Sequence, residues 1–300
     1  MMRRLFLSLA RMHSTFARLI LIGSCIISFA CHSSPAINQF EIKDLDVEVG
    51  QWEFQSQNAH SWNQPRRRFI EDKPGDFEYD DNSVVRARHA LEAEVGVLDW
   101  LRMRVGVEFE KERLDDPPAL FLRDDFDALK LEEIAVEWVA VFIPVEPHRV
   151  GLGLLVEYQH LLESEEPNSI VLGPIVETEW AGWELVLNPT FVHFFGGNPR
   201  DTKVDFAYGA HILYDMTLAL NVGIEAYGTL ERLWSTGTRS VESSLFGEHD
   251  LHRLGPSAYY QHIFAGGDDQ QVLSIGLGLF FGMNDNTPDY IFKWSVEFEF

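Results

Sequence analysis

The chain has 300 residues, of which 47 are acidic and 24 basic, so its formal net charge at pH 7 is −23. This acidic balance argues against a nucleic-acid partner, whose phosphates would be repelled. Both cysteines, Cys25 and Cys31, lie near the N-terminus. The rest of the chain is therefore expected to fold without a disulfide.

The N-terminus has the features of a secretory signal peptide. Four arginines precede an apolar run from Leu19 to Ala30, and no acidic residue occurs before Glu41. The run is shorter than the ~20 residues that a membrane-spanning helix requires, and small residues follow it as cleavage sites. We predict a signal peptide over residues 1–36. A lipoprotein signal around Cys25 is the alternative, although the apolar run continues past that cysteine.

Residues 37–300 contain no linker or low-complexity tract, so we predict one domain. From residue 85 onward the sequence alternates apolar and polar residues with a period of two. Residues 85–97 and 101–109 each have one apolar face and one face rich in arginine and glutamate, and a short turn joins them. This pattern predicts a β-hairpin.

Twelve such segments follow one another along the chain. They start near Val47, Val85, Leu101, Leu129, Val150, Ile170, Trp183, Val204, Thr217, Arg253, Val272 and Tyr290. The connections alternate between tight turns and long loops, with tight turns expected at 98–100, 181–182 and 215–216 and long loops at 56–84, 111–128, 194–203 and 228–252. An even strand number with short turns at one end and long loops at the other is typical of outer-membrane barrels.

The last strand alternates from Tyr290 to an aromatic C-terminal residue, Phe300. A soluble β-sandwich would also alternate. The membrane interpretation is favoured because the polar faces are too charged for a sandwich core and because aromatic residues collect at strand ends. We predict an all-β fold, a transmembrane antiparallel up-and-down β-barrel of about twelve strands.

The polar faces of these strands should line the interior of the barrel, where acidic residues outnumber basic ones. The candidate lumen-lining residues are Arg86, Arg88, Glu92, Glu94, Arg102, Arg104, Glu108, Glu110, Glu137, Glu157, Glu177, Glu225, Arg253 and Lys293. If the first hairpin closes through residues 98–100, Glu94 faces Arg104 and Arg88 faces Glu110 as cross-strand ion pairs. Such charges either select solutes or neutralise and fill a closed interior.

Three further features leave alternatives open. Inward glycines such as Gly151 and Gly153 either make room for a solute or admit a large opposing residue. The outward prolines Pro174, Pro189 and Pro256 are expected at bulges or strand ends, since proline lacks a ladder donor. Residues 37–45 either enter the lumen as a plug or stay outside it.

The sequence gives little support for catalysis or a metal site. The outward histidines His89 and His160 have no evident serine and asparagine partners on a neighbouring strand, so a lipid hydrolase is only a remote alternative. The stretch from Glu248 to His252 has two histidines and two carboxylates, but acidic loops produce such clusters by composition alone. We predict a non-enzyme without a catalytic site, metal or cofactor.

Four stretches resemble a bacterial family of outer-membrane transporters associated with the meta-pathway of phenol degradation. They are 93–101, 220–228, 252–256 and 287–290, and the resemblance covers roughly residues 85–300. It implies an outer-membrane β-barrel with a role in solute passage, and no catalytic motif.

Together these observations predict a passive or weakly selective channel for small molecules, apolar or aromatic ones among them according to the resemblance. The alternative is a closed structural or binding barrel with a charge-paired interior and partner-binding loops. The expected location is the outer membrane of a Gram-negative bacterium, reached through the periplasm. The expected partners are outer-membrane lipid and lipopolysaccharide, with the solute unknown.

Overall fold

The computed structural model describes residues 41–65, 68–73, 76–80, 83–114, 129–162, 167–196, 204–230, 233, 251–264, 271–285 and 287–300. The predicted signal peptide, residues 1–36, lies outside the described residues, so this prediction and the domain boundary at residue 37 stay predictions. Within the described part of the chain, no helix is both long and apolar enough to span a bilayer.

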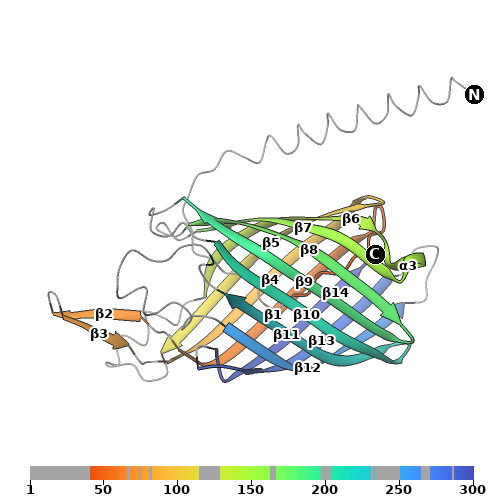
Figure 1. Ribbon diagram of the computed structural model, residues 1–300. Coiled ribbons are helices and arrows are strands. Elements are labelled where there is room, and N and C mark those ends of the chain that lie inside the picture. Colours follow the sequence, from red (N-terminus) through yellow and green to blue (C-terminus); the bar gives the residue numbers. More distant parts are fainter. Residues whose placement is uncertain are drawn as a thin grey trace, which may run out of the picture. The chain divides into compact units, whose positions relative to one another are not determined.

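Twelve antiparallel strands form one closed barrel, in which β1 pairs with both β14 and β4 (Figure 1). The barrel strands are β1 (Trp52–Pro65), β4 (Ser83–Leu98), β5 (Leu101–Leu114), β6 (Lys130–Ile143), β7 (Val150–Leu161), β8 (Asn168–Trp180), β9 (Trp183–Phe195), β10 (Val204–Thr217), β11 (Leu220–Leu230), β12 (Leu251–Phe264), β13 (Gln271–Gly282) and β14 (Tyr290–Glu299). The helical turn α3 (Val145–His148) connects β6 to β7, and β2 (Arg68–Lys73) and β3 (Asp76–Asp80) form a separate hairpin. The predicted fold class is confirmed.

Side chains alternate between the two faces of the barrel wall. On β7 and β8, residues at odd positions from Gly151 to Glu177 are buried inside, and many residues at even positions are exposed on the outer surface. Exposed aromatic side chains mark the strand ends, with Trp52, Trp100, Trp180 and Tyr214 at the end of the tight turns and Tyr290 at the other. Aromatic rims of this kind lie at the interfaces of a bilayer.

Two predicted connections differ from the structure. The turn between β10 and β11 lies at residues 218–219, not at 215–216, because the strand continues through a register shift after Asp215. Residues 56–84 are only partly a loop, since β1 extends to Pro65 and the β2–β3 hairpin follows. The periodicity of β1 was hard to read because its outer face carries the polar residues Ser56 and Asn58.

The expectation of bulges or strand ends at the prolines is wrong. Pro174 and Pro189 lie inside β8 and β9, and the β8–β9 ladder is interrupted between Leu172 and Val176 without a change of register. Pro256 lies at a similar interruption between β12 and β13. The wall therefore accommodates the missing donors by local gaps in pairing, while the register on both sides stays the same.

The register of the β4–β5 hairpin brings opposite charges together inside the barrel. Glu94 faces Arg104 and Arg88 faces Glu110, as predicted from the sequence. The Arg104 Nε atom lies 2.8 Å from Glu94 Oε2, and the Arg88 Nε atom lies 2.7 Å from Glu110 Oε2. Both predicted cross-strand ion pairs are confirmed.

This register can be tested by a double-mutant cycle on Arg88→Met and Glu110→Gln. Because the two groups are paired and largely buried, their effects on the free energy of unfolding should be coupled by about 1 kcal/mol or more. Urea unfolding of the refolded protein in detergent measures the four proteins of the cycle. Arg113, on the outer face of β5 by the same alternation, gives a control cycle with Glu110 that should be additive. Additive losses for Arg88 and Glu110 would contradict the pairing.

Candidate functional site

All fourteen predicted lumen-lining residues occupy inner-face positions of the wall. Ten of them are buried, namely Glu94, Arg102, Arg104, Glu108, Glu137, Glu157, Glu177, Glu225, Arg253 and Lys293. The other four, Arg86, Arg88, Glu92 and Glu110, are partly buried. Whether any of them contacts a solute stays a prediction.

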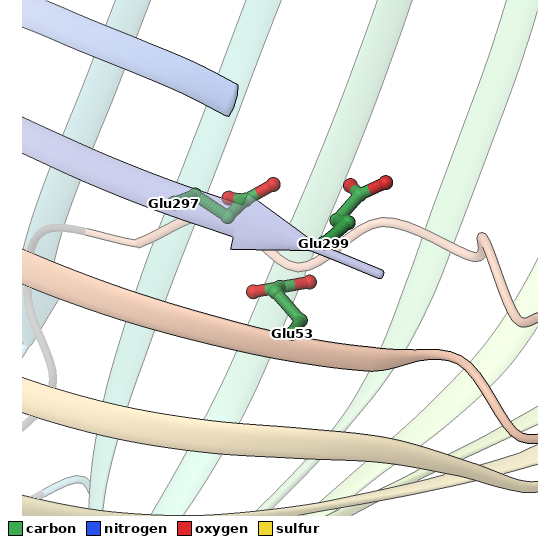
Figure 2. A group of neighbouring side chains, drawn as sticks. All are labelled: Glu53, Glu297 and Glu299. Atoms are coloured by element: carbon green, nitrogen blue, oxygen red, sulfur yellow. The ribbon is translucent and has the colours of Figure 1, made fainter. Parts of the chain in front are cut away.

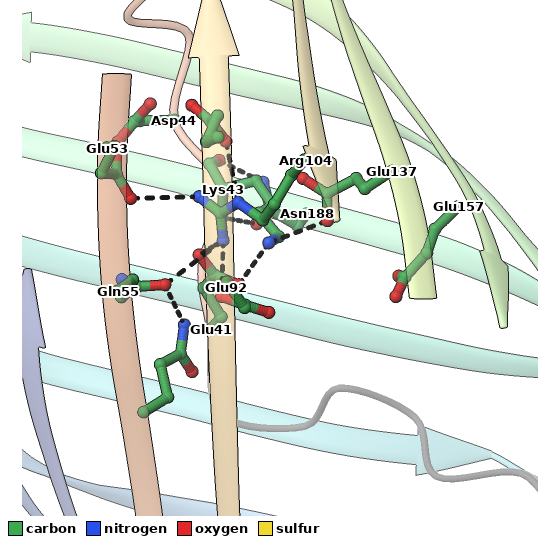
Figure 3. A network of polar contacts seen from close by, with 12 residues as sticks. Glu41, Lys43, Asp44, Glu53, Gln55, Glu92, Arg104, Glu137, Glu157 and Asn188 are labelled. Carbon is green, nitrogen blue, oxygen red and sulfur yellow. Dashed lines mark hydrogen bonds and ion pairs between the residues drawn. The ribbon is translucent and has the colours of Figure 1, made fainter. Parts of the chain in front are cut away.

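Residues 41–48 lie inside the barrel, where polar groups of the wall bind them. The Arg102 guanidinium donates to Asp44 Oδ1 at 2.7 Å and to the carbonyl oxygens of Asp44 and Asp46, each at 2.9 Å. On the opposite wall, the Asn188 amide accepts from the Lys43 N–H at 2.6 Å and donates to the Lys43 carbonyl at 2.9 Å. The segment is thus held by side chains of β5 and of β9, and Figure 3 labels Lys43, Asp44 and Asn188 among the residues of this network.

The side chains of this segment complete the charge network of the wall. Lys43 Nζ lies 2.8 Å from Glu137 Oε2, and Glu157 faces Glu137 across the β6–β7 ladder. Glu41 forms ion pairs with both Lys43 and Arg104. Lys43 therefore offsets an otherwise acidic part of the wall, and Glu41 joins Lys43 to Arg104 (Figure 3).

The ionisation of the segment follows from these contacts. Burial raises the pKa of Glu41, but the charges of Arg104 and Lys43 outweigh it and lower the pKa to about 2. Burial and Arg104 lower the pKa of Lys43, but Glu137 and Glu41 outweigh them and raise it overall. Both groups are charged at neutral pH. The contribution of Glu41 to stability is therefore present above its ordinary pKa and is lost only as the pH falls toward 2.

Leu45 anchors the segment in an apolar part of the wall. It is buried, its N–H donates to Glu177 Oε2 at 2.8 Å, and a Cβ added to Gly151 would lie 2.5 Å from its Cδ1 atom. Gly153 leaves similar room for the other methyl group of Leu45. Of the two interpretations of these glycines, the structure therefore supports the approach of a large opposing residue.

Leu45 belongs to an apolar cluster on the inner faces of β6 to β10. The buried members are Leu45, Val139, Leu155, Val171, Ile175, Val186, Val192, Phe194 and Ala207. Ile42 packs against this cluster and also against a second one that contains Tyr227 and Phe280. The inner faces of β6 to β10 thus carry this apolar cluster beside buried polar residues such as Glu137, Glu157 and Asn188, whereas those of β4 and β5 are mainly charged. Sequence reasoning missed this cluster, although Val171 and Ile175 on β8 and Val192 and Phe194 on β9 stand at inner positions.

A second buried polar cluster lies on β11, β12 and β14. Lys293 Nζ lies 3.0 Å from Glu225 Oε2, 3.0 Å from the Tyr227 hydroxyl and 3.1 Å from the Tyr259 hydroxyl. Both tyrosines also donate to Glu225. Because each polar group in the cluster has partners, the arrangement is that of a satisfied structural ion pair.

Two cavities border the inserted segment. The larger has a volume of about 250 Å³ and is lined by Asp44, Arg102, Glu184, Tyr259 and Glu297 among others. The smaller, of about 50 Å³, is lined by residues that include Leu155, Val171 and Tyr227. Glu41 and Lys43 line both cavities. The segment therefore lies between the two spaces.

The outer surface holds a group that the sequence did not reveal. His89 Nδ1 lies 2.6 Å from Asn58 Oδ1 on β1, and the Asn58 amide donates to the Ser56 hydroxyl at 3.2 Å. The expectation that His89 lacks such neighbours is therefore wrong. However, Ser56 bonds to the amide and not to the imidazole, so the contact that would activate a serine nucleophile is not formed. His160 has an asparagine partner, Asn168, at 2.9 Å.

The candidate loop metal site falls largely on residues 248–250, outside the described residues. Within β12, His252 Nδ1 lies 3.0 Å from the Tyr208 hydroxyl.

Comparisons with known proteins identify similar folds. No protein-family model and no curated protein matches the chain. The crystal structure of the COG4313 outer membrane channel from Pseudomonas putida F1 is similar with a TM-score of 0.58 at 11% identity, covering 88% of this chain and 99% of that one. At this identity the similarity establishes the transmembrane barrel fold alone.

Two further structures match more weakly. The CymD monoaromatic hydrocarbon channel has a TM-score of 0.39 at 7% identity, covering 84% of this chain and 88% of that one. A Pseudomonas aeruginosa FadL homologue has a TM-score of 0.40 at 8% identity, covering 84% and 90%. Such scores carry no argument about what this chain transports.

The anchoring of the segment can be tested with Gly151→Ala and Leu45→Ala. The added methyl group would collide with Leu45, so Gly151→Ala should cost about 1–3 kcal/mol of the free energy of unfolding. Removing the Leu45 side chain removes the shortest of the new contacts and leaves the one with Val145 Cγ2 at 2.8 Å, so the double variant should lose less than the sum of the single losses. Urea unfolding in detergent measures both effects.

Gly276→Ala is the matched control, because its added carbon would meet Ser295 and Tyr259 and not the segment. Its loss should add to that of Leu45→Ala. If the cost of Gly151→Ala is the same with and without Leu45, the proposed anchoring is wrong.

Proposed function

We propose that the chain is a passive channel for small molecules in the outer membrane of a Gram-negative bacterium, and that residues 41–48 close it in the conformation described. The observation that carries this proposal is the way in which residues 41–48 are held inside the barrel. Residues 41–48 lie between the two cavities of the interior, and polar contacts with several strands of the wall hold them there. A segment of this kind can leave the lumen without unfolding the barrel.

The fold supports this location and role. The wall presents apolar side chains outward with aromatic rims at the strand ends, as a bilayer requires. Passage of solutes is a common role of such barrels, although the barrel scaffold also serves other functions. Lipid and lipopolysaccharide would then surround the outer surface.

The apolar cluster on β6 to β10 favours apolar or aromatic solutes. An apolar molecule can lie against an inner surface formed by residues such as Leu155, Val171 and Ile175 without displacing hydrogen-bonded water. In a purely polar lumen it would have to displace water that the wall binds tightly. The cluster borders the smaller cavity through Leu155 and Val171. We propose that apolar or aromatic solutes pass along this side of the lumen once the segment moves. A link to phenol degradation rests on the sequence resemblance alone.

The gating role predicts a specific effect of Arg102→Gln in planar bilayers. Arg102 binds Asp44 and Asp46, and a hydrogen bond to a charged group is worth roughly 1.5–3 kcal/mol. Its loss should raise the ratio of open to closed time by about tenfold or more. Single-channel recording in potassium chloride measures this ratio.

Arg86→Gln is the matched control, since Arg86 pairs with Glu110 and Glu112 on the wall. It should leave the ratio close to that of the unchanged protein. If the unchanged protein and Arg102→Gln are both folded and electrically silent, the closed structural barrel replaces the channel as the better interpretation.

The apolar route predicts that phenol blocks the open channel more strongly than glycerol, a polar solute of comparable size. Val171→Thr keeps the shape of the side chain and replaces one methyl group with a hydroxyl group, so it should weaken the phenol block about three- to tenfold, given ~0.8 kcal/mol for each buried methylene equivalent. The control is Val176→Thr on the outer face of the same strand. Equal block by both solutes, or equal effects of both variants, would contradict the proposed route.

A further inference from the structure

Three carboxylates converge at the end of the barrel that carries the tight turns. Glu53 lies on β1, and Glu297 and Glu299 lie on β14, with Glu53 directly opposite Glu299 in the ladder. One carboxylate oxygen from each lies within 4.8 Å of the others. Figure 2 shows the three side chains extending into a common space. All three line the larger cavity.

The protein provides little positive charge to this group. Of the described cations, only Arg104 forms an ion pair with it, through Nη2 at 3.5 Å from Glu53 Oε1. Arg104 makes shorter contacts with Glu41, Glu92 and Glu94. Its charge is therefore already shared among three other carboxylates.

Apart from the contact of Glu297 with Glu299, the remaining hydrogen bonds of the cluster come from neutral amides. The Gln51 side chain donates to Glu299 at 3.1 Å, and the Gln55 side chain donates to Glu297 at 3.1 Å. Two amides do not offset three like charges held this close together. The group therefore needs either protons or a cation.

A separate observation indicates a ligand in the same space. Ser274 lines the same cavity and faces Glu297 across the β13–β14 ladder. Its exposed fraction is 9%, and its hydroxyl has no hydrogen-bond partner within the described part of the chain. A buried hydroxyl without a partner is costly, and a bound cation or its water would satisfy it.

We propose that Glu53, Glu297 and Glu299, with Ser274 beside them, bind a divalent cation, most readily Ca²⁺. Oxygen atoms are the ligands that Ca²⁺ takes, and its variable coordination suits partly exposed glutamates on two strands better than the strict octahedron of Mg²⁺. A bound ion would link β1 to β14 where the barrel closes. The site does not depend on the proposed transport, so the two proposals can fail separately.

Calorimetric titration of the refolded full-length barrel with Ca²⁺ in a calcium-free detergent buffer tests the site. We expect one saturable binding event. Glu297→Gln should weaken it by about tenfold or more, and Ser274→Ala should weaken it by a smaller factor. Glu184→Gln is the matched control, because Glu184 lines the same cavity but pairs with His211 at 2.7 Å.

The folded state of each variant is checked by its β-sheet circular dichroism and by its heat-modifiable mobility on a gel. If the folded, unchanged protein binds no Ca²⁺ at millimolar concentration, the site is refuted and the three glutamates share protons instead. Loss of binding in Glu184→Gln equal to that in Glu297→Gln would also overturn it, since the ion would then respond only to the general charge of the cavity. Neither result bears on the proposed channel, which the single-channel recordings test separately.

Discussion

Closure of the hydrogen-bond ladder is the constraint on which the rest of the structure depends. A sheet in a bilayer has no water to satisfy a free edge, so β1 must pair with both β14 and β4. Closure sends every second side chain into an enclosed interior. Twelve strands enclose more space than the eight whose side chains fill a barrel, and less than the sixteen of wide aqueous channels. The interior is therefore a place where additional chain can enter, and residues 41–48 do so.

The inserted segment matches the wall in both charge and shape. Lys43 meets an acidic part of the wall, Asp44 meets Arg102, and Leu45 fills the space left by two glycines. Neither the wall nor the segment is satisfied alone, because buried charges without partners are strongly unfavourable. Departure of the segment must therefore bring water or ions to the exposed groups. Water or ions can replace these polar contacts, which is what the proposed gate requires, and the apolar contacts of Leu45 and Ile42 would break at the same time.

The sequence was sufficient for the barrel and for the pairing of its first hairpin. Strand periodicity fixes which face each residue occupies, and a tight turn fixes the register, so the partners of Glu94 and Arg88 could be deduced. Contacts between distant parts of the chain could not. No local sequence pattern indicates that Leu45 contacts Gly151, or that Asn58 and Ser56 lie beside His89. Likewise, most of the chain separates Glu53 on β1 from Glu297 and Glu299 on β14. Pro174 and Pro189 were misjudged because each strand alone shows a missing donor but not the proline on its neighbour. The two prolines interrupt the same stretch of the β8–β9 ladder, so the register is kept.

The division of the inner wall explains how one lumen can serve both closure and passage. The arginines of β5 bind the polar groups of the segment, whereas β6 to β10 receive Leu45 and Ile42 in an apolar cluster and bind Lys43 through Glu137 and Asn188. If the segment leaves the lumen as proposed, the apolar surface that it covered becomes free together with the polar groups that it bound. An apolar solute could then occupy the surface that Leu45 had covered, and by doing so it would disfavour the return of the segment. Binding of solute and closure of the channel would thus compete for the same apolar surface, which couples opening to the presence of the transported molecule.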